Sequence, residues 1–96
     1  MLPTTTAETS PWVAAVGEPV VLDLASPYVV LGTLERIEGT CLRLTEADVH
    51  DLRDSKTTRE LYVLEARRHG IRCNRHVVTV RIAEIVSFSR LVDVVD

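Results

Sequence analysis

VVLDLASPYVVLGTLERIEGTCLRLTEADV, residues 20–49, is the stretch that decides the fold. Apolar side chains recur in it at every second position, which is the period of a β-strand with one buried face. Pro27 cannot donate to a strand ladder and ends the first run, and Glu38 and Gly39 make a tight turn after the second. Three antiparallel strands are therefore predicted, at residues 20–24, 28–38 and 40–49.

Gly32 lies in the middle of the second predicted strand. A glycine inside a strand costs conformational entropy, so it usually marks a sharp bend or a bulge where another backbone comes close. A strand that bends in its middle curls its sheet toward a small barrel. On the third strand we expect Leu42 and Leu44 to face the core, while Arg43 and Thr45 face solvent.

The residues before this stretch contain the start signals of a short helix. Residues 1–9 are rich in Thr without periodicity and are expected to form a flexible tail. Ser10 suits the N-cap, Pro11 the first helical position and Gly17 a left-handed end. One side of this turn is expected to cover an open end of the core with Trp12, Val13 and Val16.

The residues after the three strands predict a helical insertion at residues 58–69. Thr57 followed by Glu60 has the spacing of a capping box, and Gly70 can end the helix. The alternative is a strand, because residues 61–64 form a short apolar run whose period does not distinguish the two.

Strand character returns at residues 76–82 and 84–91, almost without a loop between them. The prediction is a mainly β fold: a five-stranded open barrel of the SH3-like type, with a short N-terminal helix and a helical insertion between strands three and four. Ninety-six residues with 46% hydrophobic content suit one core and are too few for two, so residues 10–96 are expected to form a single domain.

An open barrel leaves its edge strands unpaired. The last strand has no charge between Ile85 and Ser89, which is a poor composition for an edge exposed to solvent. Pairing with identical copies on both sides would cover the edges and close a ring.

Composition excludes several classes of protein. A formal charge of −3 argues against binding nucleic acid through bulk electrostatics, so any such contact must be local. The chain starts without a signal-peptide pattern and has no run near the roughly 20 apolar residues of a membrane span, which predicts a cytoplasmic protein without a membrane partner. Cys41 and Cys73 are 32 positions apart, so buried or half-buried thiols are expected and a disulfide is disfavoured.

Two segments resemble the Sm-like family of small barrels, which includes the eukaryotic Sm and LSm subunits and bacterial Hfq. Residues 20–49 are similar to its first motif, with Gly32 at the bent strand. VTVRIAEIVSFS, residues 78–89, is similar to its second motif, with Arg81 at the Arg of the Ile-Arg-Gly turn. Over residues 20–91 the resemblance implies an N-terminal helix, a five-stranded barrel, a ring of six or seven copies joined between strands four and five, and single-stranded RNA near the pore.

The departures from the family pattern fall where RNA would be bound. The family places an aromatic or long apolar side chain and an Asn between strands two and three, which gives a stacking surface and a base-edge hydrogen bond. Here that turn reads Gly39, Thr40 and Cys41, without a ring and with a weakly hydrogen-bonding thiol. Arg81, followed by Ile82 instead of Gly, is the main expected RNA contact; its alternative is an ion pair with Glu84 or with a neighbouring copy.

A basic cluster lies outside both motifs and consists of Arg67, Arg68, Arg72 and Arg75, with His69 and His76. Several guanidinium groups together can hold phosphate. We favour a structural explanation, because cations suit the C-terminal end of a helix and the acidic residues 46–54 offer ion-pair partners.

A second polar group has ligand types that suit a metal ion, His50 with Asp48, Asp51 and Asp54. Its spacing matches no metal loop of known mechanism, so a solvated turn is predicted there, and no metal or cofactor. No nucleophile elbow or phosphate loop occurs, and we do not expect an enzyme.

These observations predict a non-catalytic, ring-forming Sm-like protein that binds single-stranded RNA or another anionic polymer weakly. The expected contacts are Arg81 with Thr40 and Cys41 at the pore, and the arginines of the basic cluster. The alternative is an oligomeric scaffold for protein partners that has lost RNA binding, and a small-ligand barrel or enzyme is a third option.

Overall fold

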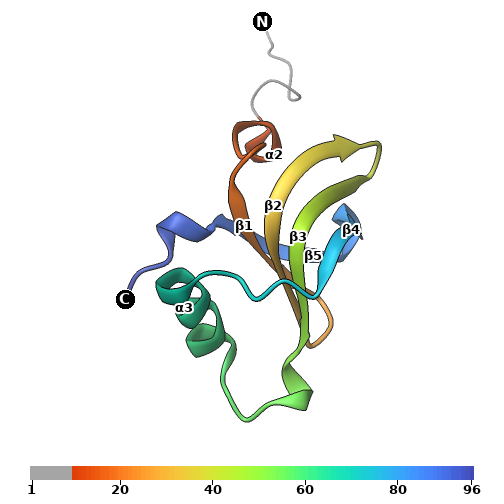
Figure 1. The fold of residues 1–96 in the computed structure, drawn as a ribbon. Helices are drawn as coiled ribbons and strands as arrows, with labels where there is room; N and C mark the ends of the chain where they lie inside the picture. The colour runs from red at the N-terminus through yellow and green to blue at the C-terminus, as the bar shows by residue number, and fades with distance from the viewer. Residues whose placement is uncertain (1–9) are drawn as a thin grey trace, which may run out of the picture.

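Five antiparallel strands form one sheet in the order β4-β3-β2-β1-β5, in a computed structural model that describes residues 10–96 (Figure 1). The strands are β1 (Pro19–Leu24), β2 (Tyr28–Glu38), β3 (Cys41–Asp51), β4 (Arg75–Arg81) and β5 (Ile85–Arg90). The sheet is unclosed, with β4 and β5 at its two edges, which confirms the predicted mainly β, open-barrel architecture. The predicted tail at residues 1–9 lies outside the described residues.

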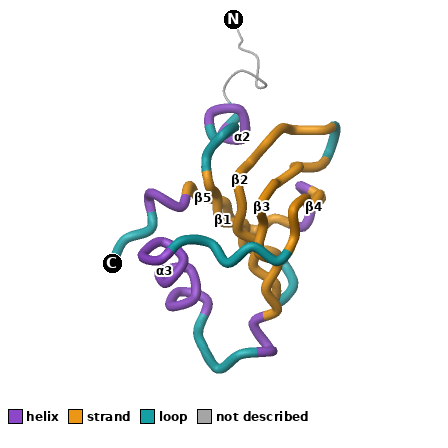
Figure 2. Tube along the Cα trace, viewed as in Figure 1, coloured by secondary structure: helices purple, strands orange, loops and turns teal. Residues whose placement is uncertain are grey.

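Within residues 10–96, two short α-helices accompany the sheet, α2 (Pro11–Ala14) and α3 (Arg59–His69), with 3-10 turns η1 (Leu52–Asp54), η2 (Ile82–Glu84) and η3 (Leu91–Asp93) (Figure 2). Ser10 caps α2 as predicted, since its hydroxyl accepts the N–H of Trp12 at 3.2 Å. The helix α3 is confirmed, and the alternative strand is wrong. No helix among residues 10–96 is long and apolar enough to span a membrane.

The predicted capping box of α3 is wrong by one residue. The N-cap is Thr58, whose hydroxyl accepts the N–H of Leu61 at 3.1 Å. Thr57 and Thr58 are adjacent and equally suitable as caps, so the sequence pattern alone does not choose between them.

Gly32 of β2 lies opposite a bulge in the neighbouring strand β3. Leu31 pairs with Asp48 and Thr33 pairs with Thr45, so Gly32 lies opposite two residues of β3 instead of one. A Cβ atom at Gly32 would lie 3.0 Å from the Cβ and 3.1 Å from the Cα of Ala47. The predicted close backbone approach is confirmed, and the hairpin of β2 and β3 curls as a barrel requires (Figure 1).

One face of the sheet carries the main core. Its fully buried side chains include Val20, Leu22, Leu34, Leu42 and Leu44. Trp12 of α2 covers one end of this core with its ring edge-on to Phe88, at a centroid distance of 4.7 Å. Val13 and Val16 remain 48% and 45% exposed, so their predicted part in this cover is wrong: α2 is a single turn and presents only Trp12 to the sheet.

The opposite face of the sheet carries a second core beneath α3. Val21, Val29 and Leu31 pack there against Val63, Ala66 and Leu91. The apolar residues of β1 and β2 are consecutive, which is typical of strands covered on both faces. This run is a sequence signal that both faces of the sheet are covered, the second by α3 and η3.

Candidate functional site

The tip of the hairpin between β2 and β3 meets the turn that follows β4. The carbonyl of Thr40 accepts the N–H of Ile82 at 2.9 Å, and Cys41 pairs with Arg81 across the ladder. Thr40, Cys41 and Arg81 therefore form one surface, which we call the hairpin-tip surface. The side chain of Arg81 is 75% exposed and its guanidinium lies 3.9 Å from Glu84, so the predicted ion pair is present but long.

Ile82 stands where the Ile-Arg-Gly pattern has its glycine, and its packing gives a reason for this departure. Its side chain packs against the edge of the main core, and its residue begins the 3-10 turn η2. An apolar side chain contributes burial at this position, which a glycine would not do.

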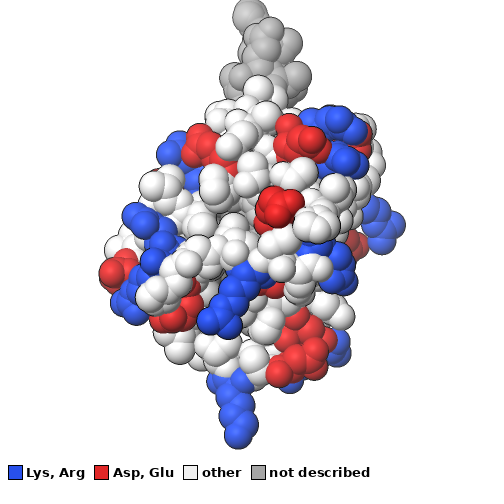
Figure 3. All heavy atoms as spheres, viewed as in Figure 1, with Lys and Arg blue, Asp and Glu red and all other residues white. Residues whose placement is uncertain are grey.

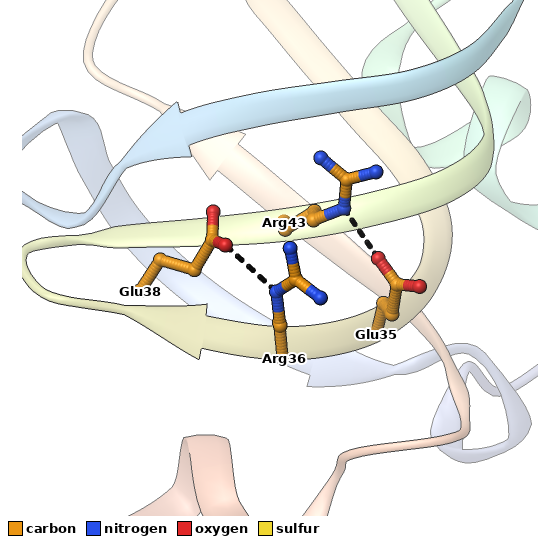
Figure 4. A network of polar contacts seen from close by, with 4 residues as sticks. All are labelled: Glu35, Arg36, Glu38 and Arg43. Atoms are coloured by element: carbon orange, nitrogen blue, oxygen red, sulfur yellow. Dashed lines mark hydrogen bonds and ion pairs between the residues drawn. The ribbon is translucent and has the colours of Figure 1, made fainter.

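Two further arginines near the hairpin tip are held by carboxylates. Arg36 lies opposite Arg43 in the ladder, and Figure 4 shows how each guanidinium faces an acidic side chain. Arg36 Nε is 2.7 Å from Glu38, and Arg43 Nε is 2.5 Å from Glu35. Exposed pairs of this kind contribute only about 0.2–1 kcal/mol, so a polyanion could compete for either arginine.

The basic cluster does not join the hairpin-tip surface. Arg75 begins β4 opposite Ala47 and Arg81 ends it opposite Cys41, a separation of about 20 Å along a strand. Arg68 lies 3.6 Å from Glu65 and 3.4 Å from Asp96. Figure 3 shows basic and acidic side chains interspersed on the visible face, without one continuous basic patch.

A buried polar network between β3 and α3 replaces the predicted solvated turn. Asp48 is 5% exposed and accepts hydrogen bonds from the hydroxyl of Tyr62 and from Asn74 Nδ2, the latter at 3.1 Å. The His50 ring stacks on Tyr62 at 3.9 Å. The prediction was wrong because β3 continues to Asp51 and α3 covers its end.

The electrostatics of this network follow from burial and hydrogen bonding. Burial raises the pKa of Tyr62 well above its usual range, and the hydrogen bond to Asp48 adds to this. At Asp51, the last residue of β3, hydrogen bonds from Arg53 lower the carboxyl pKa to about 2. Sequence reasoning missed Tyr62 and Asn74; the alternation that places Asp48 and His50 on one face was the available signal.

Both cysteines are free thiols, as expected. Cys41 is half-buried at the hairpin tip, whereas Cys73 is exposed in the segment between α3 and β4. The expected burial is therefore wrong for Cys73, because that segment runs outside both cores.

An unclosed sheet of five antiparallel strands, with a short helix before β1 and a single turn joining the two edge strands, is an Sm-like open barrel. A solved structure of this kind is that of the Pyrococcus abyssii Sm protein in complex with a uridine heptamer. The similarity has a TM-score of 0.56 at 10% sequence identity, and covers 91% of this chain and 99% of the Sm chain. No family model matches this sequence, and no curated protein matches it. At this identity the similarity establishes the fold.

Proposed function

We propose that this chain forms a ring of identical copies and holds single-stranded RNA, or another anionic polymer, weakly at the hairpin-tip surface. The observation that carries the proposal is the hydrogen bond between Thr40 and Ile82, which brings Arg81 beside Thr40 and Cys41. The similar Sm protein was solved with a uridine heptamer, which supports RNA as the polymer.

The ring would form through the two free strand edges. The outer edges of β4 and β5 pair with no strand of residues 10–96. They leave Val77 41% and Val86 71% exposed, which is unfavourable for an edge in water. Pairing β4 of one copy with β5 of the next satisfies both backbones, and repeating this contact around an axis gives a closed ring. The resemblance to the Sm-like family implies six or seven copies in it.

Binding at the hairpin-tip surface would be mainly electrostatic. Each copy contributes one exposed guanidinium, that of Arg81, and the turn at Gly39, Thr40 and Cys41 offers no ring for a base to stack on. Affinity would therefore fall steeply with salt and depend little on base identity. The arginines of the basic cluster, Arg67, Arg68, Arg72 and Arg75, would form a separate binding surface for longer polymers.

The test is the fluorescence anisotropy of labelled oligo-U and oligo-A at several salt concentrations. Arg81→Ala should weaken binding of both and lower the salt slope by about 0.7 for each phosphate that the guanidinium no longer neutralises. The control is Arg53→Ala, which removes an exposed arginine at the other end of β3. If Arg81→Ala left both affinity and slope unchanged, the hairpin-tip surface would not be the site.

A second candidate is a scaffold for protein partners that has lost RNA binding. The ion pairs of Arg36 and Arg43 and the net charge of −3 favour it, because they leave little free positive charge near the tip. A scaffold would remain oligomeric by light scattering while binding neither oligonucleotide at low salt. No catalytic step is proposed in either case.

A further inference from the structure

Three side chains of metal-ligating types meet where the segment after α3 enters β4. They are Glu46, Cys73 and His76, and their ligand atoms all lie within 4.8 Å of one another. The closest pair is His76 Nδ1 and a carboxylate oxygen of Glu46, at 3.3 Å. This trio lies at the opposite end of β4 from Arg81, so it is separate from the hairpin-tip surface.

The bulge opposite Gly32 brings Glu46 into this group. Glu46 has a φ of 48°, the only positive value at a non-glycine residue among residues 10–96. Left-handed backbone is unfavourable for Glu, and a bulge commonly redirects the side chain of its first residue. Here Glu46 reaches His76 on the neighbouring strand. The ladder thus joins residues that are 30 positions apart in sequence.

The spacing of the three ligand atoms suits a tetrahedral ion. Zinc bonds of about 2.0–2.3 Å at tetrahedral angles place the nitrogen, oxygen and sulfur ligand atoms about 3.3–3.6 Å apart. The pair of His76 and Glu46 is already at this spacing, and the remaining pairs must shorten by about 1.3 Å at most. All three residues are exposed, so their side chains can move by rotamer changes alone.

The donor atoms select the kind of metal. Sulfur and imidazole nitrogen suit Zn²⁺ and disfavour Mg²⁺ and Ca²⁺, which take oxygen ligands. The thiolate of Cys73 and the carboxylate of Glu46 together carry two negative charges, which balance those of a divalent ion. Without metal, the Cys73 thiol donates to the Arg75 carbonyl at 3.2 Å, and binding would break this hydrogen bond.

We propose that Glu46, Cys73 and His76 form a zinc site that ties the bulge of β3 to the start of β4. Three protein ligands leave a fourth position facing solvent, which water or an anionic ligand would fill. Binding releases the thiol proton and fixes the segment between α3 and the edge strand β4. The site depends on neither the ring nor RNA.

The test is a titration of the chelator-treated full chain with Co²⁺, followed by Zn²⁺, in a reductant that does not bind metal. We expect one Co²⁺ per chain, with tetrahedral visible bands and a thiolate charge-transfer band that Zn²⁺ removes. Cys73→Ser should abolish the charge-transfer band. His76→Ala or Glu46→Gln should weaken Zn²⁺ binding by at least about 10-fold, since each removes a direct ligand and even an outer-shell partner is worth about 10–100-fold. The matched controls, Cys41→Ser and His69→Ala, should change neither.

A measurement on the unmodified chain makes the result independent of variant folding. Zn²⁺ should slow the alkylation of Cys73 by iodoacetamide and leave the rate at Cys41 unchanged, as followed by peptide mass spectrometry. The proposal is overturned if the charge-transfer band is absent or survives Cys73→Ser, or if Zn²⁺ protects neither thiol.

Discussion

Gly32→Ala tests the feature that curls the sheet. The added Cβ would lie 3.0 Å and 3.1 Å from the Cβ and Cα of Ala47, and 3.2 Å from the carbonyl oxygen of Thr45. Two of these three atoms are backbone, so they can recede only if β3 moves. The φ angle of Gly32 is not in the left-handed region, so alanine meets no conformational barrier and the effect comes from space alone.

The magnitude follows from two opposing effects. Forcing an extra methyl group into a packed position costs about 1–3 kcal/mol. Replacing glycine by alanine also restricts the unfolded chain, which raises the free energy of unfolding by about 0.4–1 kcal/mol. We therefore expect Gly32→Ala to lower the free energy of unfolding by about 1–2 kcal/mol.

The assay is urea unfolding at one fixed protein concentration, followed by the fluorescence of Trp12, the only tryptophan of the chain. Ala47→Gly removes the nearest atom but leaves the Cα, so in a double-mutant cycle it should recover about 0.5–1 kcal/mol of the cost of Gly32→Ala. Gly39→Ala is the control, because a Cβ at Gly39 meets no atom within 4 Å. Ala47→Gly should therefore not reduce the cost of Gly39→Ala. A Gly32→Ala protein as stable as the original chain would refute the close approach.

Three further predictions concern the cover of the core, the buried network and the free edge. Trp12→Ala should cost about 2–3 kcal/mol in urea unfolding, since it removes a half-buried ring from the main core, whereas Val13→Ala at an exposed position should cost less than about 0.5 kcal/mol. Tyr62 should hold its proton above pH 10, where the tyrosines of the unfolded chain ionise, so the stabilisation should be complete below about pH 10 and fall above it. Phenolate absorbance and urea midpoints measure the two effects. Tyr62→Phe should remove the late-titrating phenol and lower the free energy of unfolding by about 1–3 kcal/mol, because Asp48 is then left without this donor. If Tyr62→Phe removed a phenol that titrates near pH 10 and left the late-titrating one, the network would be contradicted. Val86→Lys should reduce the mass measured by light scattering, whereas Val92→Lys outside the strands should leave the mass unchanged. Equal masses for both variants would argue against β5 as the contact edge.

Local patterns were sufficient to predict most of the fold. The strand β2 was predicted with the bounds that the structure shows, because Pro27 and Gly39 end its apolar pattern on both sides. Gly32 could be interpreted because few physical reasons place a glycine inside a strand. The helix α3 was predicted from its capping and end residues, although the choice between two adjacent threonines was wrong.

The residues that depend on register could not be predicted. The left-handed backbone of Glu46 arises from a bulge whose position is fixed by the pairing of β2 with β3. Asp48 looked like part of a solvated acidic turn, because its burial depends on Tyr62 and Asn74 from later segments. Cys73 and His76 meet Glu46 only when β4 pairs with β3, so no spacing along the sequence indicated this group.

The central claim is that the free edges of β4 and β5 pair between identical copies. Multi-angle light scattering of the full chain tests it most directly, at several protein concentrations and without added RNA. The account predicts a mass six or seven times the 10.7 kDa of one chain, constant on dilution. A mass of 10.7 kDa at every concentration would contradict it.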